Sequence, residues 1–141
     1  VIIGTFSESD ARMSQIDLDM KILVVDDQIT MTRIIKNLLG QLHFTNIDTA
    51  SDGDHAISQL RLHRYILIIS DWNMERVSGL SLLKHVRADK DLCDIPFIMI
   101  TAESKVDNIV AAKESGVSNY IVKPFTAATL QSKIAATFKG L

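Results

Sequence analysis

Cysteine, net charge and long apolar stretches are all scarce in this chain of 141 residues. The single cysteine, Cys93, excludes an internal disulfide and is typical of a reducing compartment. A formal net charge of −2 provides no basic excess, so we expect no nucleic-acid partner. The N-terminal run VIIGTF is too short to span a membrane and lacks the preceding basic residues of a secretory signal. These absences favour a cytoplasmic protein that does not bind membranes.

The chain also lacks linkers, internal repeats and low-complexity tracts, and its length favours one domain. It begins with valine, and Met13 and Met20 are both plausible starting residues. We therefore expect residues 1–18 to be an N-terminal extension that is flexible or was added by cloning. We expect residues 19–141 to form the one domain, with no output domain after it.

Five short apolar segments alternate with five segments of helical periodicity. In the first helical segment, for example, apolar residues recur at positions 31, 34, 35, 38, 39 and 42. Strands that alternate with helices predict a parallel sheet covered on both faces, and the least apolar strand, NIDTA, is expected at an edge. Asp52 and Ser78 are expected to cap helices, and so is Ser104. The expected strands are residues 21–25, 46–50, 65–70, 97–101 and 119–122.

Polar side chains lie at the carboxyl ends of four of these strands. Asp26 and Asp27 follow the first strand, Asp71 the third and Lys123 the fifth, while Thr101 ends the fourth. Each has an ordinary structural explanation when taken singly, but parallel strands end at one edge of the sheet, where ligands bind. Clustered carboxylates repel one another unless a cation neutralises them, and hard oxygen ligands suit Mg²⁺. With a lysine as a point charge for an anion, the set describes phosphoryl transfer to an aspartate.

The residues Asp26–Asp27, Asp71, Thr101 and Lys123–Pro124 resemble, in position and order, the receiver domain of bacterial two-component response regulators. The resemblance covers residues 21–141. The stretches SDWNM, TAE and NYIVKPFTAATL are similar to the single-domain chemotaxis regulators of that family. The resemblance implies a flavodoxin-like, doubly wound (βα)₅ fold, with a parallel five-stranded sheet in the order 2-1-3-4-5.

The resemblance also implies a role for each acid. Asp71 accepts a phosphoryl group from a sensor histidine kinase. Asp27 and Asp71 ligate Mg²⁺, Asp26 acts mainly through water, and the backbone carbonyl of Asn73 completes the protein ligands. Such a protein is not a conventional enzyme, because it catalyses its own phosphorylation, from phosphohistidine or small phosphodonors, and its own dephosphorylation.

The other implied roles concern the response to phosphorylation. Lys123 pairs with the phosphoryl oxygens, Thr101 moves to hydrogen-bond them, and Tyr120 turns inward behind it. The small Ala102 leaves its N–H free to approach a phosphate, although simple packing explains this residue equally well. Lys123–Pro124 is expected to be a cis peptide bond. The surface of the fourth helix, fifth strand and fifth helix then binds a target, which in the chemotaxis branch is the flagellar motor switch protein.

Asn73 and Glu103 occupy the two positions that tune the acyl phosphate lifetime in this family. Their identities predict a lifetime of seconds to a few minutes. A phosphatase is a further candidate partner, and we expect a monomer. The alternative function is a stand-alone receiver that acts as a phosphate sink or as a phosphorelay intermediate. Neither the kinase nor the target is named by the sequence.

One loop departs from the family. After DWNM the family usually continues with proline, whereas this chain reads Glu75, Arg76, Val77 and Ser78. Loss of the proline removes a fixed φ, which predicts a less rigid loop and leaves its effect on kinase recognition open. The neighbouring Trp72 is a candidate fluorescent reporter of Mg²⁺ binding.

Two other functions share some of these features. A haloacid-dehalogenase-type phosphatase carries Asp-x-Asp on its nucleophile strand, whereas here the second position is Asn73 and the nucleophile follows the third strand. A flavodoxin-like FMN binder holds phosphate with a hydroxyl-rich loop after the first strand, where Asp26 and Asp27 would repel it. The sequence disfavours both.

Overall fold

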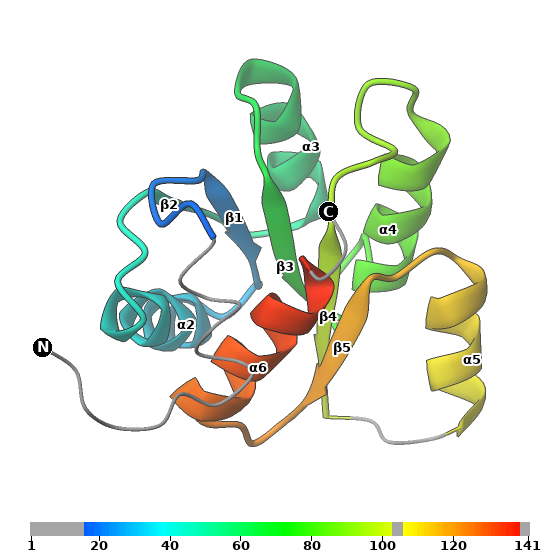
Figure 1. The fold of residues 1–141 in the computed structure, drawn as a ribbon. Coiled ribbons are helices and arrows are strands. Elements are labelled where there is room, and N and C mark those ends of the chain that lie inside the picture. Colours follow the sequence, from blue (N-terminus) through cyan, green and yellow to red (C-terminus); the bar gives the residue numbers. More distant parts are fainter. Residues whose placement is uncertain (1–15, 103–105, 139–141) are drawn as a thin grey trace, which may run out of the picture.

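The computed structural model describes residues 16–102 and 106–138, in which strands and helices alternate along the chain. Figure 1 shows the strands side by side at the centre of the molecule with helices around them. The strands are β1 (Ile22–Val25), β2 (Ile47–Ala50), β3 (Leu67–Asp71), β4 (Phe97–Thr101) and β5 (Asn119–Val122). The helices are α2 (Ile29–Gln41), α3 (Gly53–Leu62), α4 (Gly79–Ala88), α5 (Val106–Glu114) and α6 (Ala127–Thr137).

The sheet has five parallel strands in the order β2-β1-β3-β4-β5, which confirms the predicted fold and strand order. The weakly apolar β2 lies at an edge, as predicted, because only one of its four residues is buried. The strand β3 lies in the middle, and all five of its residues are buried. The acid at its end, Asp71, therefore leaves the sheet between β1 and β4.

The side chains of the sheet pack into two separate hydrophobic cores, one on each face. Ile22 and Val24 point into the core beneath α2 and α6, while Leu23 and Val25 point into the core beneath α3 and α4. This alternation follows from the two-residue period of a strand. Each of these four side chains is fully buried, because a sheet covered on both faces leaves no polar side.

Two apolar positions were assigned to the core wrongly. Ile34 was predicted on the buried face of its helix but is 44% exposed, and Ile66 was predicted within a buried strand but is 41% exposed. The buried stripe of α2 is narrow and centres on Ile35 and Leu39, so Ile34 lies about 100° around the helix from it. Ile66 precedes β3, which begins at Leu67, two residues after the start of the strand expected at 65–70.

The helix ends follow local hydrogen-bonding rules. Asp52 accepts a hydrogen bond from the His55 amide at 2.7 Å and Ser78 accepts one from the Ser81 amide, so both predicted caps are confirmed. The expected cap Ser104 lies outside the described residues. Thr126 caps α6 in the same way, although the sequence analysis did not single it out.

Three residues that precede β1 join the core of α2 and α6. Ile16 and Leu18 are partly buried against it, and Met20 is 5% exposed within it. Of residues 1–18, which were expected to form an extension, only 16–18 are described. Across the described ranges, no helix has the length and apolar character needed to cross a membrane.

Candidate functional site

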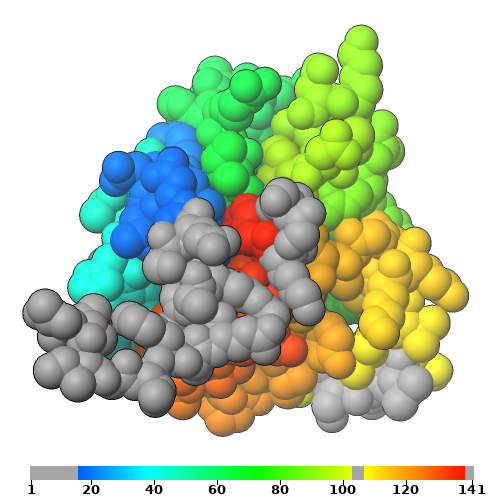
Figure 2. Space-filling view, in the orientation of Figure 1, coloured from blue at the N-terminus to red at the C-terminus, as the bar shows by residue number. Residues whose placement is uncertain are grey.

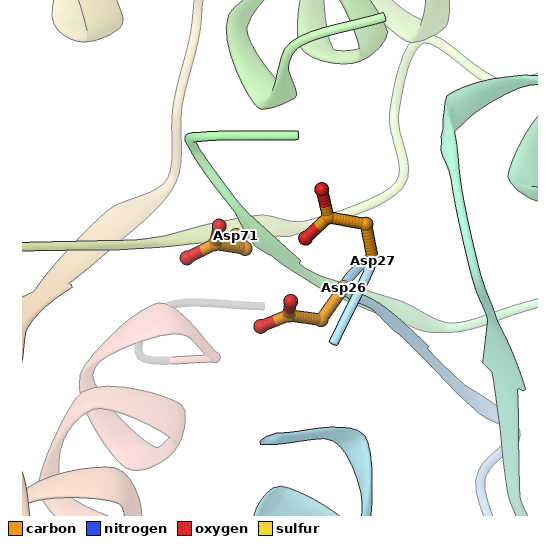
Figure 3. Close-up of side chains that lie close together, drawn as sticks. All are labelled: Asp26, Asp27 and Asp71. Atoms are coloured by element: carbon orange, nitrogen blue, oxygen red, sulfur yellow. The ribbon is translucent and has the colours of Figure 1, made fainter. Parts of the chain in front are cut away.

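Three carboxylates meet at the carboxyl edge of the sheet. The register pairs Val25 with Ser70, so the residues that follow them, Asp26 and Asp71, leave adjacent strands side by side. One carboxylate oxygen from each of Asp26, Asp27 and Asp71 lies within 4.8 Å of the others, and the described residues contain no second group of this kind. Figure 3 shows Asp26 and Asp27 at the end of β1 and Asp71 at the end of β3, all around one space.

The three acids differ in exposure. Asp26 is 2% exposed and Asp71 is 5% exposed, whereas Asp27 lies on the surface. The Oδ1 atom of Asp26 accepts a hydrogen bond from the Gln28 amide at 2.9 Å, but its Oδ2 atom is buried without a partner. Burial chiefly raises the pKa of Asp26, to about 6, and the negative charge of Asp71 adds to this effect. A buried carboxylate with one unpaired oxygen is poised to accept a cation.

The arrangement fits a hard divalent cation. The unpaired Oδ2 of Asp26, the buried Asp71 and the exposed Asp27 offer oxygen ligands to one point that solvent can reach. Mg²⁺ prefers such oxygens, uses one or two carboxylates and keeps several waters. Asn73 lies on the surface two residues beyond Asp71, where its carbonyl was predicted to complete the ligand set.

Lys123 approaches the same site from β5. Its Nζ lies 2.7 Å from Oδ1 of Asp71, and its side chain is 24% exposed. Its backbone N–H donates a hydrogen bond to the carbonyl of Thr101, the buried last residue of β4. The Lys123–Pro124 bond is cis, which confirms that prediction. A cation therefore lies against one oxygen of Asp71, where an anionic group on that residue would also lie.

Of the remaining predicted residues, the structure describes Ala102 and Tyr120. Ala102 is exposed directly after Thr101, and Glu103 lies outside the described residues. Tyr120 is partly buried in β5, at the level of Met99 rather than Thr101. The Nζ atom of Lys133, on α6, lies 5.4 Å from the centroid of the Tyr120 ring, within the range of a cation–π contact.

Gly79 is a site residue that the sequence analysis missed. It begins α4 directly beneath the acid at the end of β3, and its N–H donates a hydrogen bond to the Trp72 carbonyl at 2.8 Å. A Cβ atom at Gly79 would overlap the carbonyl oxygen of Asp71 and lie 2.9 Å from the Cα of Trp72. Glycine is therefore required for α4 to lie this close to Asp71. A glycine after a serine cap was the available signal.

Comparison with known proteins agrees with this geometry. The sequence model of the response regulator receiver domain family matches residues 22–135 of this chain. Chemotaxis protein CheY-3 of Vibrio cholerae serotype O1 is 49% identical over 123 residues, which cover 87% of this chain and 95% of that protein. Chemotaxis protein CheY of Pseudomonas aeruginosa is 49% identical over 120 residues, covering 85% and 97% respectively. The crystal structure of V. cholerae CheY4 at low pH has a TM-score of 0.80 and 29% identity, covering 85% of this chain and 99% of that one.

The fold and the site first define a class, the doubly wound α/β proteins with an acidic site at the carboxyl edge of the sheet. Within that class, the chain belongs to the receiver-domain family of response regulators. The curated relatives that are 49% identical to it over the matched residues are CheY-type chemotaxis proteins.

Replacement of Asp26 by asparagine tests how much the buried charge of Asp26 lowers the free energy of unfolding. The pKa of Asp26 is raised from 3.8 to about 6, so the folded state holds this proton more tightly than the unfolded state. The free energy of unfolding therefore falls as the pH rises through this window. Two pKa units correspond to about 3 kcal/mol, so Asp26→Asn should stabilise the metal-free protein at pH 7.5 by up to this amount. The gain should shrink towards pH 4.

Urea unfolding in EDTA and in MgCl₂ measures this effect. Mg²⁺ should raise the free energy of unfolding of the wild type, because it binds only the folded state. It should raise that of Asp26→Asn much less, because this variant lacks the Asp26 carboxylate that attracts the ion. The exposed Asp27→Asn is the matched control in EDTA and should gain less stability. If Asp26→Asn were no more stable than the wild type in EDTA at pH 7.5, the buried charge of Asp26 would not destabilise the folded protein, contrary to its raised pKa.

Replacement of Gly79 by alanine tests the close approach of α4. The added methyl group must displace the Asp71 backbone, so we expect a loss of about 1–3 kcal/mol in the free energy of unfolding. Gly40, in α2, has no atom within 4 Å of an added Cβ, so Gly40→Ala should instead stabilise by about 0.5–1 kcal/mol. Urea denaturation compares the two variants, and equal stabilities would show that α4 tolerates the extra atom.

Proposed function

We propose that this protein is a response regulator whose Asp71 accepts a phosphoryl group from a sensor histidine kinase in the presence of Mg²⁺. The observation that carries the proposal is the contact between Lys123 and Asp71 beside the three-carboxylate cluster. A buried carboxylate with a cation on one oxygen and a cation-binding cluster at its side has the groups that phosphoryl transfer needs.

The transfer uses the free carboxylate oxygen of Asp71 as nucleophile. That oxygen attacks the phosphorus, a P–O bond forms, and the P–N bond to the donor imidazole breaks, so the electron pair leaves with the histidine. A bound Mg²⁺ would neutralise phosphoryl charge, and Asp26, Asp27, Asp71 and the Asn73 carbonyl would hold it. Lys123 already lies 2.7 Å from Asp71 and can pair with the phosphoryl oxygens without a large movement.

The response to phosphorylation involves Thr101 and Tyr120 on the two neighbouring strands β4 and β5. Thr101 is 3% exposed, so movement of its hydroxyl towards the phosphoryl group would vacate space within the protein. The partly buried Tyr120 then turns inward and leaves Lys133, whose Nζ lies over its ring. This exchange changes the face formed by α5, β5 and α6; in Figure 2 the yellow surface of α5 adjoins the orange surface around β5, and α6 is drawn in deep orange to red.

The proposed output is chemotaxis control of the flagellar motor from the cytoplasm. Support comes from the two relatives named as chemotaxis proteins, whose matches span nearly the whole of each relative. In this proposal the α5–β5–α6 face binds the flagellar motor switch protein once Asp71 is phosphorylated. The phosphoryl group then leaves Asp71 by hydrolysis within seconds to a few minutes, and Asn73 and Glu103 set that rate.

A phosphomimic tests the output directly. Beryllofluoride with Mg²⁺ should tighten binding of a flagellar motor switch fragment by about 5- to 150-fold, the usual range of coupling between two sites. Calorimetry measures the affinity, and Trp72 fluorescence reports separately whether the phosphomimic has bound. The control Asp71→Asn should show no tightening.

Two failures of this test have different meanings. If Trp72 reports phosphomimic binding but the switch fragment binds no more tightly, the motor role is wrong and the sink or relay role replaces it. If neither signal responds in the wild type, the assignment of Asp71 itself is wrong.

A further inference from the structure

The loop that departs from the family is held in a strained turn. The Val77 amide donates a hydrogen bond to the Glu75 carbonyl at 2.8 Å, and the residue between them, Arg76, has a φ of 68°. A bond that spans two residues around a positive φ marks the rarer and more strained form of γ-turn. Residues with a Cβ atom, such as arginine, rarely adopt this conformation, so neighbouring contacts must maintain it.

One such contact is the packing of Val77 against the first residue of α3. Gly53, the first residue of α3, has no side chain, and a Cβ atom there would lie 2.5 Å from both the Cβ and the Cγ1 of Val77. The valine therefore occupies the space that any other residue at position 53 would fill. Arg76 also pairs with Asp54 at 3.0 Å, but the two side chains are 75% and 55% exposed, so this pair contributes little.

The turn directs one backbone group at the acid cluster. The Glu75 N–H donates a hydrogen bond to Oδ2 of Asp27 at 3.1 Å. Within the described ranges, this is the hydrogen bond that the Asp27 side chain receives, and Asp27 is the exposed member of the three acids. A carboxylate has about four acceptor positions, so Asp27 can keep this bond and still ligate a cation.

We propose that the Glu75 N–H, held in place by the Val77–Gly53 contact, is a positioning group that orients Asp27 for Mg²⁺. The inference rests on the proposed function, because it assumes that the acid cluster binds this metal. Groups that hydrogen-bond a metal ligand fix its direction and affect metal affinity. The backbone of Glu75 performs this role, and its side-chain carboxylate is not needed for it.

Two substitutions of Glu75 separate its backbone from its side chain. Both Glu75→Pro and Glu75→Ala remove the carboxylate, but only proline also removes the N–H. We expect Glu75→Pro to weaken Mg²⁺ binding by roughly tenfold, the lower end of the range for a lost partner of a metal ligand. Glu75→Ala should stay within about twofold of the wild type, since its N–H remains to orient Asp27. Titration of the full chain with MgCl₂, followed by Trp72 fluorescence and calorimetry, measures both affinities.

A change outside the loop provides a second test. Gly53→Ala leaves the sequence of the loop unchanged but puts a methyl group into the space that Val77 occupies. Mg²⁺ affinity should fall in this variant too. In EDTA, the Glu75 amide should exchange with deuterium faster than in the wild type, which is a readout that needs no metal.

The outcomes are distinguishable. If the wild type binds no Mg²⁺, the proposed function and this inference both fail. If the wild type binds Mg²⁺ and Glu75→Pro binds it as tightly as Glu75→Ala does, only this inference fails. Unchanged exchange of the Glu75 amide in Gly53→Ala, with unchanged Mg²⁺ affinity, would likewise overturn the role of the Val77–Gly53 contact.

Discussion

The buried pair of carboxylates, Asp26 and Asp71, is the constraint on which the rest of the site depends. Two negative charges leave adjacent strands, each nearly inaccessible to water, and one oxygen of Asp26 has no hydrogen-bond partner. Such an arrangement opposes folding unless cations offset it. Lys123 supplies one cation from within the chain, at 2.7 Å from Asp71. The unpaired oxygen of Asp26 and the exposed Asp27 leave a place for a second cation from solution.

In the proposed function, this constraint connects the Mg²⁺ site, the phosphoryl group on Asp71 and the switch residues Thr101 and Tyr120. A cation or a phosphoryl group at Asp71 would change the electrostatic environment of Lys123 and Thr101, which lie at the ends of β5 and β4. Because β4 and β5 are hydrogen-bonded neighbours, and β5 carries Tyr120 and leads into α6, a change at the acids would reach the α5–β5–α6 face in that proposal. The other side of the site is bounded by the turn at Arg76, which ties Asp27 to the first residues of α3.

The fold and most of the site could be predicted from the sequence because both depend on simple rules. Alternating apolar runs and helical periodicity give a parallel sheet, and parallel strands end at one edge whatever the register. Asp26, Asp71 and Lys123 could thus be brought together without coordinates, and the cis bond before Pro124 followed from the family resemblance.

Contacts between distant segments could not be predicted in this way. The exposure of Ile34 depends on how α2 rolls on the sheet, and the need for glycine at position 79 depends on how closely α4 approaches Asp71. The loop at 75–78 was expected to lose rigidity with the family's proline. In the structure it packs on α3 through Val77, a contact that arises only because residue 53 is a glycine. Packing between elements decides such features, and local sequence does not record it.

Chemical mapping of the acyl phosphate tests the account most directly. The protein is incubated with acetyl phosphate and MgCl₂ and reduced at once with borohydride, which converts a phosphorylated aspartate to homoserine, and its peptides are then analysed by mass spectrometry. If Asp71 is the phosphorylation site, homoserine forms at position 71 alone, depends on Mg²⁺ and is absent from Asp71→Asn. Homoserine at position 26 or 27, or equal labelling in EDTA, would contradict this assignment.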